Sequence, residues 1–428
     1  MTPTLGDQPR RRGAVAAALA GVVAAGTLAA CSSSGGDELV WYINPDAGGQ
    51  AAVAEACSKQ LGIEITTQVL PQAAGEQRIQ LARRLAAEDS AIDLMSIDPP
   101  YTAEFANAGY LAEIPEDMQQ RLREQAFEGA AEAATWEDSL VVAPFWSNTQ
   151  VLWYRKSVVQ EAGLDMSQPV TWDQIIQAAV DTDTKVAVQA NKYEGYSVWI
   201  NALVAGAGGE LATDTEKGAD ATITVDSEAG RAAAGVIEEL AGSTAAPADI
   251  SVAQEGQAGA TFGGPAGGFM VNWTYIWTNY DATQPEVKED LGFARYPQTV
   301  EGQESRPPYG GIGIGVSAFS DHEAEAIEAL ECLTSPENQG LNAELTGNMP
   351  SSAAGYDYPA LKETYPQELL DLFQESLEAA APRTVSPYWS DISGALQARF
   401  HPPSSVDGDT PGEAQTFIED VLKQEDLL

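Results

Sequence analysis

Hydrophobic positions in the first part of the chain alternate between the periods of strands and helices. Apolar runs at 39–43 and 93–97 and a period-two segment at 63–69 predict strands, while helical spacing predicts helices at 50–61 and 76–88. The order strand, helix, strand, helix, strand is typical of a mostly parallel sheet with helices on both faces. We therefore predict an α/β fold.

The segment 143–156 (Ala-Pro-Phe-Trp-Ser-Asn-Thr-Gln-Val-Leu-Trp-Tyr-Arg-Lys) predicts a strand that connects two lobes. Its second half is apolar, as a buried strand requires. A buried strand does not explain why Trp146 and Asn148 precede that apolar half. We interpret the segment as the crossing between lobes, with Asn148 facing the cleft that separates them.

A second segment rich in proline and glycine, at 306–316, predicts a second crossing. At 428 residues the chain is too long for one ordinary domain. With boundaries at the two crossings, we predict that lobe 1 consists of 37–145 and 306–350 and that lobe 2 consists of 146–305 and 351–428.

Helical spacing and caps predict further helices along the chain. Thr171 and Gln174 form the sequence pattern of a capping box at the start of one of them. An acidic surface helix is expected at 115–138, and a buried strand at 269–277. The other predicted helices are 102–111, 171–180, 196–205, 227–240, 323–333, 358–380 and 410–427.

The first residues have the pattern of an exported lipoprotein. A basic run at 10–12 precedes an apolar run at 14–25, and Leu28-Ala29-Ala30-Cys31 resembles a bacterial lipobox. We expect a signal peptide at 1–30, lipidation at Cys31, a flexible tether at 31–37 and anchoring on the outer face of the cytoplasmic membrane. The alternative is a short transmembrane anchor.

Two further cysteines, Cys57 and Cys332, lie in helical patterns. They can be two buried small apolar residues, or they can form a disulfide. An oxidising, exported setting favours the disulfide.

Charge excludes some partners. The chain has 22 Lys and Arg against 63 Asp and Glu, a formal net charge of −41. Nucleic acid is not expected as a partner, because phosphate binding requires concentrated positive charge. An anionic ligand is disfavoured for the same reason.

Catalysis has little support in the sequence. His322 and His401 lie near no serine or cysteine motif, so a catalytic triad is not expected. The glycines at 310–315 lack the Lys-Ser/Thr of a phosphate-binding loop, and no metal-ligand spacing occurs, so we expect no metal and no cofactor. Acid pairs are so numerous that a glycoside hydrolase stays open as an alternative.

Aromatic, amide and acidic residues at the ends of predicted strands suit a neutral ligand rich in hydroxyls. Sugar C–H faces lie on aromatic rings, and sugar hydroxyls need both donors and acceptors. The alternative for Trp273 is a core position on a buried strand. The candidates are Asp98 and Glu255 as acceptors, Asn148 as donor and acceptor, Arg383 as a donor fork, Trp273 as the aromatic platform, and Asn44 after the first strand.

Several segments resemble the extracellular solute-binding proteins of sugar ABC importers, the maltose/trehalose-type cluster. The resemblance spans nearly the whole chain after residue 30 and is closest to the trehalose-binding lipoproteins of actinobacteria. The matching segments are 76–85 (Glu-Gln-Arg-Ile-Gln-Leu-Ala-Arg-Arg-Leu), Asp98 with 102–105, 148–155 (Asn-Thr-Gln-Val-Leu-Trp-Tyr-Arg), 187–191 with Glu194-Gly195, 271–273 (Val-Asn-Trp), and Arg383 with Pro387.

The resemblance implies a two-lobe, periplasmic-binding-protein-like clamshell that closes on its ligand. Its sugar contacts carry over to Asp98, Asn148, Glu255, Trp273 and Arg383, with main-chain contact around Gly311. Asn44, Glu76 and Gln77 are further candidates.

We therefore expect a monomeric, lipid-anchored protein that delivers an α-linked disaccharide, with trehalose first, to an ABC permease. Two departures from the trehalose binders border the cleft: the segment 278–307 is shorter, and Phe145-Trp146 replaces smaller residues. Another cargo (maltose, maltodextrin, a glycerol phosphodiester or a peptide) and a glycoside hydrolase are the alternatives.

Overall fold

The computed structural model describes residues 38–428. The expected signal peptide (1–30), Cys31 and the tether (31–37) lie outside these residues. Within the described residues, no helix is both long and apolar enough to cross a membrane.

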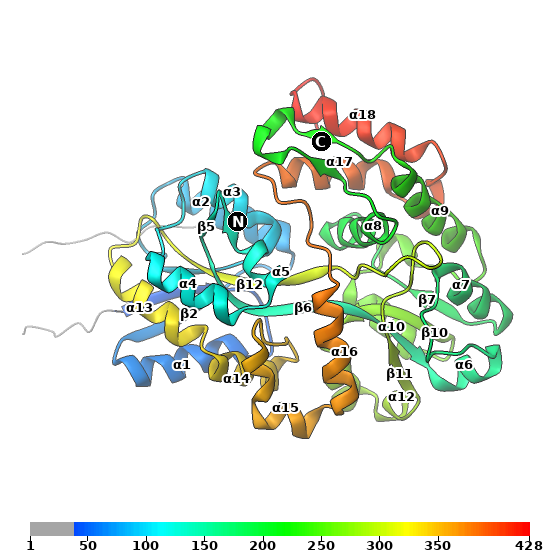
Figure 1. Cartoon of the computed structure of the whole chain (residues 1–428), viewed down its shortest axis with the longest axis horizontal. Coiled ribbons are helices and arrows are strands. Elements are labelled where there is room, and N and C mark those ends of the chain that lie inside the picture. The colour runs from blue at the N-terminus through cyan, green and yellow to red at the C-terminus, as the bar shows by residue number, and fades with distance from the viewer. Residues whose placement is uncertain (1–37) are drawn as a thin grey trace, which may run out of the picture. The chain divides into compact units, whose positions relative to one another are not determined.

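One mixed sheet forms the centre of the described chain (Figure 1). Its strands follow the order β2-β1-β3-β12-β6-β10-β7, and β11 also pairs with β6. The strands are β1 (Glu38–Ile43), β2 (Glu64–Val69), β3 (Leu94–Ile97), β6 (Ala143–Arg155), β7 (Lys185–Ala187), β10 (Gly267–Trp273), β11 (Leu291–Ala294) and β12 (Tyr309–Val316).

The first five elements confirm the predicted alternation. β1, β2 and β3 are parallel neighbours, and they are connected through α1 (Gly49–Leu61) and α2 (Ala74–Leu85). All four residues of β3 are buried, as expected for a central strand covered on both faces. The predicted α/β class is therefore confirmed.

Strand β6 connects two parts of the sheet. Its first half pairs antiparallel with β12, from Ala143↔Ile314 to Thr149↔Tyr309. Its second half pairs with β10 and β11 instead, from Gln150↔Trp273 to Arg155↔Leu291. The predicted crossing at 143–156 is therefore one continuous strand, and Figure 1 shows it running between the two groups of helices.

The helices of the described chain cover this sheet. The α-helices after α2 are α3 (Thr102–Asn107), α4 (Glu116–Gln125), α5 (Glu128–Ala133), α6 (Lys156–Ala162), α7 (Trp172–Asp181), α8 (Glu194–Gly206), α9 (Glu228–Gly242), α10 (Glu255–Gly263), α11 (Ile276–Thr283), α12 (Pro285–Glu289), α13 (Glu323–Leu333), α14 (Pro336–Thr346), α15 (Pro359–Thr364), α16 (Gln367–Glu378), α17 (Trp389–Phe400) and α18 (Thr410–Leu422).

Short 3-10 helices and hairpins complete the described elements. The 3-10 helices are η1 (Pro99–Tyr101), η2 (Thr215–Asp220), η3 (Ile250–Val252), η4 (Ala353–Asp357) and η5 (Pro403–Ser405), and the two hairpins are β4 (Thr135–Trp136) with β5 (Ser139–Leu140) and β8 (Ala212–Thr213) with β9 (Thr222–Ile223).

The single acidic helix predicted at 115–138 is wrong. The chain forms α4 and α5 and then the β4–β5 hairpin. Ala126 is extended (ψ 153°) and ends α4, while Glu137 and Asp138 have positive φ angles of 46° and 69° at the hairpin turn. Aspartate tolerates the left-handed conformation of such a turn, so the density of acidic residues did not indicate a helix here.

Two other predicted boundaries also moved. The helical pattern at 358–380 is broken by Pro366 into α15 and α16, because proline disfavours helical geometry in the residue before it. The strand predicted at 269–277 ends at Trp273, and α11 begins at Ile276.

The capping box predicted at Thr171 is confirmed. The Gln174 backbone N–H donates to Thr171 Oγ1 at 3.2 Å, and Thr171 N–H donates to Gln174 Oε1 at 2.9 Å. This reciprocal pair satisfies two of the backbone donors that a helix start leaves free.

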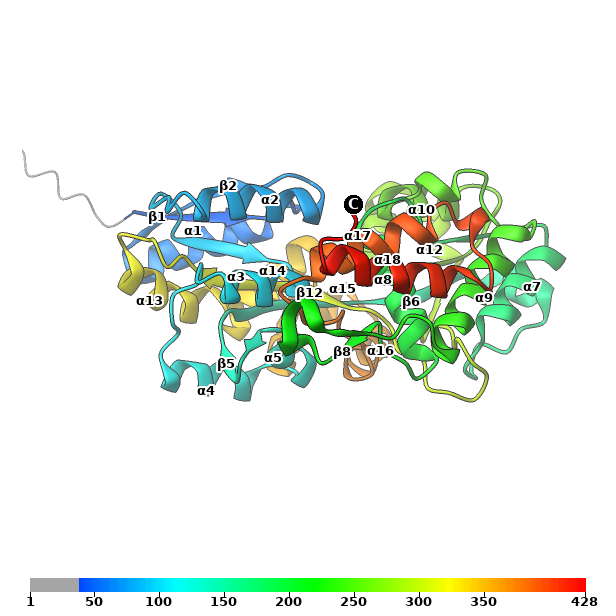
Figure 2. The same ribbon diagram turned by 90° about the horizontal axis from the view of Figure 1, so that it is seen from above.

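The end of the chain packs beside the middle of the chain. α17 contacts α8 and α18, and α18 contacts α9, an arrangement visible from above in Figure 2. This packing positions the segment before α17, which contains Arg383, next to the start of α8.

A disulfide joins Cys57 of α1 to Cys332 of α13, with the two Cα atoms 5.9 Å apart. The Asn338 side chain donates to the Cys332 backbone carbonyl at 2.8 Å. α1, α13 and α14 therefore form one cross-linked layer on the sheet.

Candidate ligand-binding site

A cavity of about 720 Å³ brings together the residues predicted to bind ligand. They come from the loops after β1 and β3, from the starts of α2 and α10, from β6, β10 and β12, and from the segment before α17. The predicted residues that line it are Asn44, Glu76, Gln77, Asp98, Asn148, Glu255, Trp273, Gly311 and Arg383.

Arg383 connects two carboxylates inside the cavity. Its Nη2 donates to Asp98 Oδ1 at 2.7 Å and its Nη1 donates to Glu194 Oε1 at 2.9 Å. The Arg383 side chain is only 5% exposed. Burial opposes its charge, but the two carboxylates raise the pKa of the guanidinium above its ordinary value.

The sequence predicted Arg383 as a donor fork for the ligand and did not predict Glu194 as its partner. Glu194 also accepts from Trp389 Nε1 at 2.8 Å and from Ser393 Oγ at 2.6 Å. Both of its oxygens are therefore occupied, and we assign it the role of holding Arg383 in place. Only the position of Glu194 at the start of α8, facing the predicted cleft, could have indicated this role.

Asp98 has one oxygen left for a ligand. Its Oδ1 accepts from Arg383. Burial raises the pKa of the Asp98 carboxyl, Arg383 opposes that rise, and Glu194 adds to it.

Asn148 is available to a ligand only as a donor. Its Oδ1 accepts from Thr274 Oγ1 at 2.7 Å, from Thr274 N–H at 3.3 Å and from Thr149 N–H at 3.0 Å. Its Nδ2 has one long contact, 3.5 Å to Asn348 Oδ1. The expectation that Asn148 both donates and accepts is therefore wrong for the acceptor.

Trp273 presents its ring to the cavity. It is the last residue of β10, is partly exposed and belongs to neither hydrophobic cluster of buried residues. A Cβ atom at Gly310 would lie 2.8 Å from its Cζ3, so the glycine of β12 leaves room for the indole. The alternative of a core position is wrong for Trp273.

Two further predicted residues stabilise the backbone that surrounds the cavity. The Gln77 side chain donates to the Pro71 carbonyl at 2.9 Å, which fixes the loop before α2. Gly311 has φ +145°, and a Cβ there would overlap the Trp146 carbonyl oxygen. The glycine is thus required for the close approach of β12 to β6.

Glu255 begins α10 and faces Tyr193 and Trp273. Burial raises the pKa of its carboxyl. Its own backbone N–H, the Tyr193 hydroxyl and the Trp273 indole oppose that rise by favouring the charged form. The carboxylate accordingly has nearby polar groups but no cation among the residues that line the cavity except Arg383.

Three buried polar atoms in the cavity wall have no hydrogen-bond partner: Asn44 Oδ1, Trp146 Nε1 and Tyr193 Oη. Buried polar groups are normally paired, since an unpaired one destabilises the protein by about 1–3 kcal/mol. The Asn44 oxygen is thus an acceptor and the Trp146 indole N–H a donor for a molecule that enters the cavity. The Tyr193 hydroxyl is a second donor, which touches Glu255 without forming a bond of normal geometry. The sequence predicted Asn44 but missed Tyr193, because a tyrosine before a helix carries no distinctive signal.

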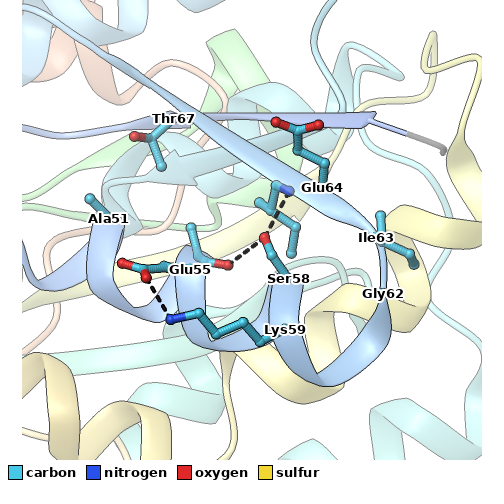
Figure 3. Close-up of a pocket in the computed structure, with 10 residues that line it drawn as sticks. Ala51, Glu55, Ser58, Lys59, Gly62, Ile63, Glu64 and Thr67 are labelled. Atoms are coloured by element: carbon cyan, nitrogen blue, oxygen red, sulfur yellow. Dashed lines mark hydrogen bonds and ion pairs between the residues drawn. The ribbon is translucent and has the colours of Figure 1, made fainter. Parts of the chain in front are cut away.

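Two other hollows of the described chain lack these features. A shallow groove of about 490 Å³ lies between α1 and β2 (Figure 3), where Glu55 pairs with Lys59 at 2.5 Å and Ser58 Oγ donates to the Ala54 carbonyl. A cavity of about 770 Å³ lies on the other side of Arg383 and is lined mainly by acidic side chains, glycines and alanines.

Metal binding has no support in the described residues. No group of three or more His, Cys, Asp or Glu side chains in residues 38–428 is arranged to hold a metal ion.

Several known proteins share the fold. The maltose-bound MalE3 of T. maritima matches with a TM-score of 0.79 and 22% identity over 91% of this chain and 99% of that one. The GacH receptor of Streptomyces glaucescens, solved unliganded and with acarbose, matches with a TM-score of 0.76 and 21% identity over 91% and 98%. A cyclic α-maltosyl-1,6-maltose binding protein from Arthrobacter globiformis matches with a TM-score of 0.73 and 19% identity over 91% and 100%.

The sequence comparisons identify the family. A probable ABC transporter-binding protein of Deinococcus radiodurans is 23% identical over 368 residues, which cover 81% of this chain and 83% of that protein. The family model for bacterial extracellular solute-binding proteins matches residues 42–340. This chain, with its two-lobe fold and a cavity between strand ends, therefore belongs to the family of bacterial extracellular solute-binding proteins.

Proposed function

We propose that the protein is the substrate-binding component of an ABC importer and that its cavity binds an uncharged α-linked disaccharide, with trehalose the first candidate. One observation carries the proposal: the Trp273 indole lines a cavity whose wall also contains buried polar atoms without a hydrogen-bond partner of normal geometry. A sugar supplies an apolar C–H face and hydroxyls that both donate and accept, so it meets both requirements.

The ligands named for the similar proteins support a glucose-based ligand. Maltose, acarbose and cyclic α-maltosyl-1,6-maltose are named for three proteins with the same fold, and the Deinococcus relative is named as an ABC transporter-binding protein. A cavity of about 720 Å³ also lies within the usual size range of small-molecule sites.

The charges of the cavity argue against an anionic cargo. Arg383 is the only Lys or Arg among the residues that line it, and both of its terminal nitrogens already face carboxylates. Asp98, Glu194, Glu255 and Glu76 line the same cavity. A phosphodiester or a sugar phosphate would lose its hydration without gaining a free cation.

The delivery route is part of the proposal. We infer that the protein is exported, that Cys31 is lipidated and anchors it as a monomer, and that lobes divided at 145/146, 305/306 and 350/351 close on the ligand before it passes to the permease. Ligand-driven closure requires that the ligand binds the closed form more tightly than the open one.

Calorimetry with the chain from residue 31 onward tests the proposal. Trehalose, maltose, maltotriose and glucose 6-phosphate are titrated in turn, and each mixture is then assayed for free glucose. We expect a neutral disaccharide to bind with micromolar or tighter affinity, glucose 6-phosphate not to bind, and no glucose to appear. Release of glucose would favour the hydrolase alternative, and binding of the phosphate alone would overturn the proposed substrate class.

A further inference from the structure

Tyr193 contributes to the cavity a donor that the protein itself engages only loosely. It is the residue before α8, and its side chain lines the cavity. Its hydroxyl is buried and makes no hydrogen bond of normal geometry within the described residues. It does lie close enough to the Glu255 carboxylate to favour the charged form of that group. Because a buried unpaired hydroxyl is destabilising, the position needs an explanation outside the unliganded protein.

Gly195 determines where the Tyr193 ring lies. A Cβ atom at Gly195 would overlap the hydroxyl oxygen and Cζ of Tyr193. The tyrosine ring therefore folds back over the first turn of α8 and occupies the space that any other residue at 195 would fill. Gly195 has no positive φ, so this space is the reason for a glycine in a helix that an alanine would otherwise stabilise.

The surroundings keep this hydroxyl protonated. Burial and the nearby Glu255 carboxylate raise the pKa of Tyr193 well above its ordinary value. A phenol that stays protonated beside a carboxylate gives the cavity a donor and an acceptor at neighbouring points. A vicinal pair of sugar hydroxyls has the matching acceptor and donor.

We propose that Tyr193 is a ligand-contacting residue whose hydroxyl donates a hydrogen bond to an oxygen atom of the bound sugar, next to the oxygen that Glu255 contacts. The inference rests on the proposed function, because it requires a hydroxylated ligand in this cavity. It assigns a role to the side chain, and through it to Gly195, that neither the sequence nor the comparisons indicate.

Two variants test the inference by calorimetry with trehalose and maltose and by thermal unfolding without ligand. Tyr193→Phe removes only the hydroxyl, so we expect about tenfold weaker binding, ~1.4 kcal/mol, with an unchanged or higher Tm of the unliganded protein. Gly195→Ala pushes the ring away, so we expect a similar loss of affinity without a loss of Tm, since alanine favours the helix.

Matched controls exist outside the cavity. Tyr356 also has a buried hydroxyl without a partner, so Tyr356→Phe should behave like Tyr193→Phe in Tm but leave the affinity unchanged. Gly235 lies in α9 with open space around a Cβ atom, so Gly235→Ala should change neither the ring nor the affinity.

The outcomes separate this inference from the proposed function. If the unaltered protein binds neither sugar, the proposed function fails and the inference fails with it. If the unaltered protein binds and Tyr193→Phe binds equally well, only the inference is overturned. The hydroxyl would be structural if Tyr193→Phe had a lower Tm and Gly195→Ala had a normal affinity. That result would also overturn the inference.

Discussion

Arg383 and Asp98 are 285 positions apart in the sequence, and their side chains meet at 2.7 Å inside the cavity. The guanidinium also holds Glu194, so one cation serves two carboxylates. Asp98 follows β3, whereas Glu194 begins α8, beyond the crossing strand β6. The arginine therefore ties the two sides of the cavity together even without a ligand.

Removing the arginine should be more harmful than removing either carboxylate. Arg383→Met leaves two buried carboxylates without a cation, and we expect a loss of about 3–5 kcal/mol in the free energy of unfolding together with loss of sugar binding. Asp98→Asn keeps the Arg383–Glu194 pair, so we expect a smaller loss of stability. Urea unfolding and calorimetry measure both effects.

An exposed ion pair provides the control for these variants. Lys362 pairs with Asp357 at 2.7 Å, and their side chains are 49% and 78% exposed. Lys362→Met should change the free energy of unfolding by less than about 1 kcal/mol. An Arg383→Met variant as stable as Lys362→Met would contradict the assigned role of the arginine.

Much of the cavity could be predicted because strand ends are visible in the sequence. Asn44 and Asp98 follow apolar strands of a predicted parallel sheet, and ligands bind at the carboxyl ends of such strands. Glu255 and Arg383 were predicted from their hydrogen-bonding chemistry, and the family resemblance agreed with them and added Glu76, Gln77 and Gly311. The structure brings all of them to one cavity.

The remaining contacts could not be predicted, because they depend on side-chain direction. Asn148 was correctly expected to face the cavity, but Thr274, 126 positions later, occupies its oxygen. Glu194 and Tyr193 are adjacent and have opposite roles: both oxygens of Glu194 accept hydrogen bonds, whereas the Tyr193 hydroxyl makes none of normal geometry. The difference arises because α17 packs on α8 and brings its donors to Glu194 and not to Tyr193.

Trp273 should provide most of the apolar contact with the sugar. We expect Trp273→Ala to weaken binding of the preferred disaccharide by about 2 kcal/mol or more, roughly 30-fold, as at other buried aromatic anchors. Trp273→Phe should lose less, because a smaller ring remains. Calorimetry gives the affinities, and a ligand-induced change in tryptophan fluorescence should shrink in both variants.

Trp277 is the control for the loss of an indole. Its Nε1 donates to the Thr364 carbonyl at 3.0 Å and Lys288 Nζ lies 3.5 Å from its ring centroid, and it does not line the cavity. Trp277→Phe should lower the Tm and leave the affinity unchanged. Equal affinities for Trp273→Ala and the unaltered protein would remove Trp273 from the site.

The Cys57–Cys332 disulfide should matter for stability and not for binding. It closes a loop of 275 residues, and a long loop restricts the unfolded chain strongly, so we expect the double variant Cys57→Ser/Cys332→Ser to lose about 3–5 kcal/mol of unfolding free energy. Neither cysteine lines the cavity, so calorimetry should give an unchanged affinity. Alkylation of both cysteines in the absence of reductant, detected by mass spectrometry, would contradict the disulfide.

Glu255 should make the unliganded protein less stable as the pH rises. An ion-paired carboxylate has the opposite effect. Burial raises the folded-state pKa of Glu255 above the ordinary value of 4.5, so the folded protein binds the proton more tightly than the unfolded chain does. The free energy of unfolding therefore falls as the pH rises from about 4.5 through the folded-state pKa, and is constant above it.

Glu255→Gln removes this titration. Comparing the variant with the unaltered protein therefore separates the effect of Glu255 from that of the other Asp and Glu residues, 63 in total with Glu255. We expect the variant to be more stable than the unaltered protein at pH 7, with the difference in Tm shrinking toward zero below about pH 4.5. Its sugar affinity at pH 7 should fall, because a neutral amide is a weaker acceptor than a carboxylate. A difference in Tm that does not change between pH 4 and pH 7 would mean that the Glu255 carboxyl titrates normally. Burial would then not govern its charge, and the cavity would hold an ordinary solvated carboxylate at this position.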